Sequence, residues 1–138
     1  MTKIPGQTDF GAKPNQIIDN AQKAFQLLSS NYNPHAEEFW GVYLTHQMEL
    51  IKIVMVHKGT LNSCKIHPRD LFREAVHANC YAIIIAHNHT SQSVEPSLED
   101  VRITKKLLRC AKLLEIPILD HMIFTQDKYF SFSEAKLF

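Results

Sequence analysis

Two histidines one residue apart, in the stretch His87-Asn88-His89, are the residues of this sequence best suited to bind a metal ion. In an extended backbone, side chains at positions i and i+2 point to the same side, with their Cα atoms roughly 6–7 Å apart. Two imidazoles could then reach one cation, and imidazole nitrogen binds Zn²⁺ at about 2.0–2.1 Å. A helix would turn the two rings to nearly opposite sides, so the hypothesis requires a strand. Such pairs also occur by chance on protein surfaces.

A catalytic zinc usually needs one more protein ligand besides two histidines, with a water in the remaining position. We predict that this ligand is Asp100, in the first turn of a helix that can fold back over the strand end. Glu95 and Glu99 are rival carboxylates. The segment is also typical of a plain helix start, with Ser97 as the N-cap and an acid at N3. The two interpretations are compatible, because a capped helix start would also hold Asp100 in place.

The hydrophobic pattern predicts the elements that must position these residues. Apolar residues at three- and four-residue steps predict helices, and short β-rich or apolar runs predict strands. The predicted helices span 15–30, 68–78 and 98–114. The predicted strands span 39–44, 50–56, 61–66, 81–86, 116–124 and 129–132, with hairpin turns at 45–49 and 126–128. Runs of strands with interspersed helices indicate an α/β fold in which a mixed sheet is sandwiched by helices, rather than a doubly wound βαβ fold.

Composition places the chain among ordinary globular proteins. At roughly 150 residues per domain, its 138 residues suit one domain, which we assign to 15–138 after a loose lead-in at 1–14. Fifteen Lys and Arg against fourteen Asp and Glu leave a net charge of +1, which argues against tight binding to nucleic acid. No apolar run approaches the ~20 residues of a membrane span, and no export signal is visible. Three widely spaced cysteines suit reduced thiols in a cytoplasmic protein.

The run His87-x-His89, Ser97 and Asp100 resembles the signature of JAMM/MPN metalloproteases, also called the JAB domain. Flanking motifs are similar to those of the RadC-like branch: Gly59-Thr60, His67-Pro68-Arg69 and Asp120-His121-x-Ile123. The resemblance, over about residues 37–132, implies the cytidine-deaminase-like JAMM/MPN architecture with Zn²⁺ bound by His87, His89 and Asp100. It also implies hydrolysis of a peptide or isopeptide bond in a peptide or protein substrate, by a water activated at the metal. Ser97 would help the zinc to stabilise the oxyanion.

The same resemblance implies a glutamate at an early strand that acts as general base. The matching stretch is Glu37-Glu38-Phe39-Trp40. The family order, a glutamate, one residue and then an aromatic residue that opens an apolar strand, selects Glu37. Glu38 is the near alternative, and the pair could also be no more than a solvated strand entrance. For His121, in the later motif, we expect support of the site rather than metal ligation.

One departure from the family follows the second histidine, where Thr90-Ser91-Gln92 stands in place of the usual Pro-Ser-Gly. The change removes no ligand, but loss of a glycine predicts a differently shaped loop beside the metal and therefore a different fit to substrate.

A second function, from another class, also fits the sequence. A RadC-like protein could act as a binding or scaffold module in DNA repair or mobile-element biology, without proteolytic turnover. Homodimerisation through exposed strand edges is compatible with the sequence under either function.

Overall fold

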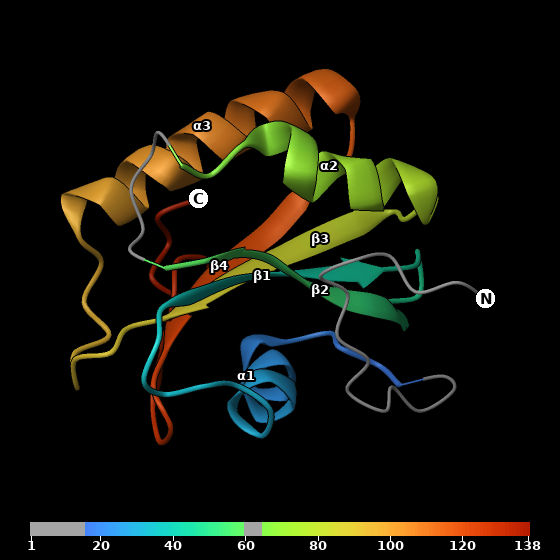
Figure 1. The fold of residues 1–138 in the computed structure, drawn as a ribbon. Helices are drawn as coiled ribbons and strands as arrows, with labels where there is room; N and C mark the ends of the chain where they lie inside the picture. Colours follow the sequence, from blue (N-terminus) through green and yellow to red (C-terminus); the bar gives the residue numbers. More distant parts are fainter. Residues whose placement is uncertain (1–15, 60–64) are drawn as a thin grey trace.

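A five-stranded mixed sheet forms the centre of the fold in the computed structural model, which describes residues 16–59 and 65–138 (Figure 1). The strand order is β2-β1-β3-β4-β5. The strands are β1 (Glu38–Leu44), β2 (Leu50–Lys58), β3 (Ala82–Asn88), β4 (Ile118–Phe124) and β5 (Tyr129–Ser131). The helices are α1 (Ala21–Ser29), α2 (Pro68–His77) and α3 (Leu98–Leu114).

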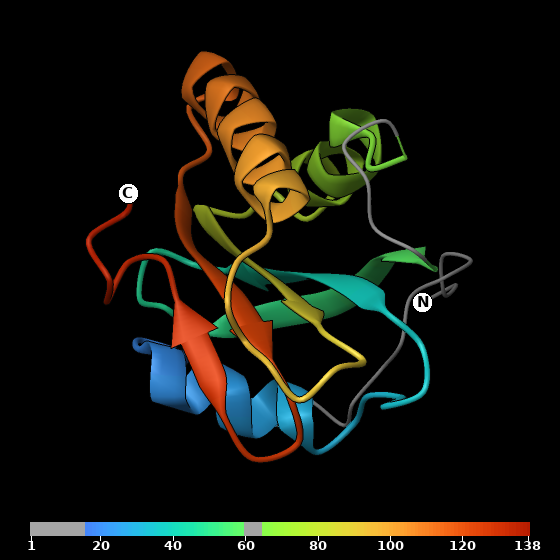
Figure 2. The same cartoon turned by 90° about the vertical axis from the view of Figure 1, so that its left-hand side faces the viewer.

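Helices cover both faces of this sheet. Helices α2 and α3 lie on one face and α1 lies on the other, as both views of the ribbon show (Figures 1 and 2). Alternate residues of each strand therefore enter one of two apolar cores. Phe39 and Ile85 pack under α2 and α3, whereas Trp40 and Ile84 pack against α1. This arrangement confirms the predicted α/β sandwich.

The strand directions bring distant parts of the chain together at one end of the strands. Strand β1 is antiparallel to β2 and β3, whereas β3 and β4 are parallel. Two parallel neighbours need a crossover connection, and α3 supplies it. The carboxyl end of β3 consequently lies beside the amino end of β1, with Phe39 paired to His87, and the chain passes from this end to the start of α3.

Both predicted hairpins are confirmed, but several predicted boundaries are wrong by two residues or more. The first helix begins at Ala21 rather than at 15, because the Asn20 side chain accepts a hydrogen bond from the backbone N–H of Lys23 at 2.8 Å and caps the helix there. The preceding residues instead pair with the β1–β2 turn, where Ile17 forms an isolated bridge with Glu49. The strand predicted at 81–86 continues through Asn88, so it includes the first histidine of the metal motif.

Two further predictions fall wholly or mostly on residues outside the described part of the chain. The lead-in at 1–14 lies entirely outside it, and so do residues 61–64 of the strand predicted at 61–66. The two remaining residues of that strand, Lys65 and Ile66, are not in a strand. Within 16–59 and 65–138, no helix has the length and apolar character needed to cross a bilayer.

Candidate metal centre

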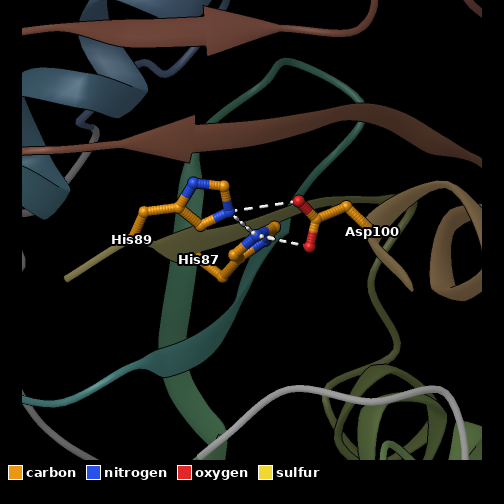
Figure 3. A group of neighbouring side chains, drawn as sticks. All are labelled: His87, His89 and Asp100. Carbon is orange, nitrogen blue, oxygen red and sulfur yellow. Dashed lines mark hydrogen bonds and ion pairs between the residues drawn. The ribbon is translucent and has the colours of Figure 1, made fainter. Parts of the chain in front are cut away.

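Three side chains that are distant in the sequence converge at the end of β3. The Nε2 atom of His87 lies 3.0 Å from Asp100 Oδ1, and the Nε2 atom of His89 lies 3.1 Å from Asp100 Oδ2. The two Nε2 atoms are 3.2 Å apart. Figure 3 shows both rings and the carboxylate pointing toward one common centre. Among the described residues, this is the only group of at least three His, Cys, Asp or Glu side chains arranged to hold one metal ion.

Strand β3 supplies the two imidazoles through its alternation. The strand ends at Asn88, but the backbone N–H of His89 still donates to the carbonyl of Phe124 at 3.3 Å, which prolongs the pairing with β4. The backbone thus stays extended through the motif, and both histidines point to the face covered by α3, while Asn88 points to the other face. His87 is fully buried, whereas the His89 side chain is 15% exposed at the rim.

The start of α3 fixes the carboxylate. Ser97 is the N-cap, and its Oγ accepts from the backbone N–H of Asp100 at 3.1 Å. In return, Asp100 Oδ2 accepts from the backbone N–H of Ser97 at 2.8 Å, which completes a capping box. The helix start therefore holds the buried Asp100 side chain in the orientation that faces the two imidazoles.

The rival carboxylates lie elsewhere. Glu99 pairs with Arg102 at 2.5 Å on the outer side of α3. Glu95 is exposed in the loop before the helix. Neither belongs to the converging group.

A chain of hydrogen bonds determines which nitrogen of His87 carries its proton. The hydroxyl of Thr104, one turn along α3, donates to the backbone carbonyl of Asp100 at 2.7 Å. The Thr104 oxygen must then accept from Nδ1–H of His121, because a hydroxyl has a single proton. Complete burial lowers the pKa of His121 well below its usual value, so the ring is neutral and its Nε2 accepts from His87 Nδ1–H at 2.9 Å. The Nε2 atom of His87 is left with a free lone pair at the centre of the site.

The second imidazole is oriented in the same way. His89 Nδ1 lies 3.0 Å from the carbonyl of Ser93, which can only accept, so Nδ1 carries the proton and Nε2 faces Asp100. The hydrogen bond with Asp100 is the largest cause that raises the pKa of His89, and the charge of Glu37 acts in the same direction. Burial alone would raise the pKa of Asp100, but the two neighbouring histidines and the backbone N–H of Ser97 hold it well below its usual range.

Aromatic rings enclose the inner side of this group. Phe39 stacks on His87 with centroids 6.0 Å apart, and Phe132 stacks on His121 at 4.8 Å. Both phenylalanines are buried. Charges at the centre are therefore shielded from water on this side, which strengthens their electrostatic interactions.

The two glutamates at the start of β1 have different surroundings. Glu38 is buried on the α1 face, where its Oε1 accepts from the backbone N–H of Asn33 at 2.9 Å. Glu37 precedes Phe39 by two residues and so shares the face of His87, and it is only half-buried. Continuing the β1–β3 register beyond Phe39 and His87 brings Glu37 opposite His89. Strand alternation, the extended register and the charge effect of Glu37 on His89 therefore indicate that Glu37, and not Glu38, is on the side of the converging group.

Beside His89 lies a polar cleft of about 430 Å³. Three segments line it: the chain before β1, the loop after β3 and the β4–β5 turn. The lining residues are Tyr32, Pro34, His89, Thr90, Ser91, Gln92, Thr125, Gln126 and Asp127. The departure from the family pattern noted above therefore falls in a wall of this cleft.

Two residues of the site, Thr104 and Asn88, carry little signal of their own in the sequence. Thr104 has one clue, its position four residues after Asp100 on the buried stripe of α3. Asn88 is the variable position of the H-x-H motif, and its role depends on contacts with residues more than fifty positions away. His121 lies behind His87 and does not belong to the group itself, as expected for a supporting residue.

Comparison with known proteins assigns the family. Residues 18–137 match the family model described as the RadC-like JAB domain. Similar curated proteins include a UPF0758 protein of Clostridioides difficile (strain 630), 46% identical over 98 residues, which cover 71% of this chain and 42% of that protein. A UPF0758 protein of Pasteurella multocida (strain Pm70) is 38% identical over 126 residues, which cover 91% of this chain and 56% of that protein. This chain thus spans about half the length of these relatives. It belongs to the RadC-like JAB domain family.

Proposed function

We propose that this chain is a zinc-dependent hydrolase of JAMM type that cleaves a peptide or isopeptide bond. One observation carries the proposal: the Nε2 atoms of His87 and His89 and the Asp100 carboxylate lie 3.0–3.2 Å from one another. All are acceptors when the far nitrogen of each ring carries the proton. A single proton can lie between only two of these groups, whereas a divalent cation compensates all three. Two nitrogens and one oxygen form a donor set that suits Zn²⁺ and leaves a position for water.

The chain's own residues supply the remaining chemistry. When bound, Zn²⁺ would polarise a water, bringing its pKa down toward ~7, and would polarise the scissile carbonyl. Glu37 would accept the proton of that water and pass it to the departing amine. Ser97 Oγ accepts from the Asp100 N–H, which leaves its own proton free to donate to the oxyanion. The polar cleft beside His89 would bind the part of the substrate on one side of the scissile bond.

Metal content is the first test. We expect about one equivalent of zinc in the wild-type protein, and loss of stoichiometric zinc in His87→Ala and Asp100→Ala, since each removes a ligand. Glu99→Ala is the matched control, because Glu99 lies in the same helical turn but pairs with Arg102. The measurement is elemental analysis after dialysis from excess zinc. Wild-type protein without stoichiometric zinc, or an Asp100→Ala variant that retains it, would contradict the proposal.

The affinity for zinc should fall as the pH is lowered. Since Asp100 raises the pKa of His89 above its usual value of 6.5, a proton competes with zinc for His89 Nε2 even near neutral pH. Raising the pH through that pKa removes the competing proton, so the apparent affinity should rise and then level off. Competition with a chromogenic chelator between about pH 5.5 and 8.5 measures this. If the affinity for zinc does not change over this pH range, His89 is not a ligand.

Thr104→Val should weaken zinc binding by about 10–100-fold, the usual effect of losing a partner that orients a ligand. Valine keeps the shape of threonine but cannot accept from His121, so the proton on His87 is no longer directed away from the metal. Thr125→Val is the control, because Thr125 is also buried but bonds to Asp127. Chelator competition at one pH compares the two variants, and equal affinities would refute the orienting role.

Glu37→Gln should keep its zinc and lose turnover by about 100-fold or more, because the amide cannot accept a proton. Turnover is measured on a panel of fluorogenic peptides and lysine isopeptides. Glu38→Gln is the matched control, since a glutamine oxygen can still accept from Asn33 N–H. If Glu38→Gln loses turnover and Glu37→Gln retains it, the assignment of the base is wrong.

A further inference from the structure

We infer that Asn88, the middle residue of the His-Asn-His motif, is a positioning residue that fixes the backbone of Glu37 beside the metal centre. The inference rests on the proposed function, since it concerns the residue proposed as general base. It gives the middle residue of the motif a role, on the face of the sheet opposite to the two histidines.

The hydrogen bonds of the Asn88 carboxamide all go to the segment that leads into β1. Asn88 is fully buried. Its Oδ1 accepts from the backbone N–H of Glu38 at 2.8 Å. Its Nδ2 donates to the backbone carbonyl of Ala36 at 2.8 Å and to that of Asn33 at 3.4 Å. All three bonds therefore reach main-chain groups on either side of Glu37, and none reaches another element.

These bonds hold a segment that the sheet itself does not pair with β3. The ladder between β1 and β3 begins at Phe39 and His87, so the preceding backbone groups need partners from elsewhere. On the other side, the backbone N–H of Gly59 donates to the carbonyl of Glu37 at 2.8 Å. The peptide groups flanking Glu37 are thus held from β3 by Asn88 and from the end of β2 by Gly59.

An amide is the group that this position requires. It must accept from one N–H and donate to carbonyls at the same time, which neither a carboxylate nor an aliphatic side chain can do. Glu38 braces the same segment through its bond to the N–H of Asn33, which accounts for its burial without a role in proton transfer. Because Asn88 lies between His87 and His89, one strand end sets both the ligands and the base in register. A displacement of about 1 Å in such a group can cost about 100-fold in rate.

The test uses the full chain loaded with Co²⁺, whose visible absorption bands report the surroundings of the ion, together with turnover on the peptide and isopeptide panel. The variants are Asn88→Ser, Glu37→Gln and the double variant. Thr45→Ala is the control, because the Thr45 hydroxyl also accepts from backbone N–H groups of a turn, but at the opposite end of β1. Cobalt stoichiometry is measured for every variant.

We expect Asn88→Ser to bind one equivalent of Co²⁺, to change the absorption bands in the same direction as Glu37→Gln, and to lower turnover by about 10-fold or more. Combined with Glu37→Gln, it should change the bands no further. Thr45→Ala should keep the wild-type bands. Wild-type bands in Asn88→Ser, or an equal additional change in the Glu37→Gln background, would overturn the inference.

Two outcomes outside this comparison are also decisive. If the wild-type protein binds no Co²⁺ or Zn²⁺, the proposed function fails and the inference fails with it. If Asn88→Ser does not fold, hydrogen exchange of the wild-type protein decides. Slow exchange of the Glu38 amide, comparable to amides inside β1, supports its hydrogen bond to Asn88 Oδ1, and exchange as fast as in exposed loops overturns the inference.

Discussion

Two imidazole nitrogens and a carboxylate face one another at hydrogen-bond distance at the end of β3, with Nε2 of His87 and His89 only 3.2 Å apart. Hydrogen bonds at the far side of each ring direct the lone pairs inward. Such an arrangement is costly unless positive charge lies at its centre, because three desolvated acceptors repel one another. The rest of the site follows from this constraint: the partly dry surroundings, the fixed ring orientations and the capped helix all serve to keep these groups together.

The fold meets this constraint by bringing three chain segments together at the carboxyl end of β3. The antiparallel pairing of β1 with β3 puts the amino end of β1 beside the histidines, and the crossover through α3 returns a helix start to the same place. Each segment is then locked by short-range bonds: the capping box for Asp100, the chain through His121 and Thr104 for His87, and the Asn88 carboxamide for the backbone of Glu37. The functional groups are thus held in place by buried side-chain hydrogen bonds, several of them to the main chain.

Much of this could be predicted from the sequence, because it depends on local rules. The alternation of a strand predicts that His87 and His89 point together, and the N-cap pattern predicts that Asp100 lies in the first turn of a helix that begins after Ser97. What could not be predicted depends on contacts across the fold. Thr104 and Asn88 are ordinary polar residues in the sequence, and their roles arise only when α3 packs on β4 and the chain before β1 packs on β3. The predicted start of the first helix is wrong for a similar reason. The apolar residues before α1 follow a helical period, but they pair with the β1–β2 turn.

Anomalous diffraction at the zinc absorption edge, from crystals grown near neutral pH with zinc present, tests the central claim most directly. We expect one strong peak about 2.0–2.1 Å from Nε2 of both His87 and His89 and at a similar distance from an Asp100 oxygen. A peak bound by other residues, or none at this position while the three side chains remain in mutual contact, would contradict it.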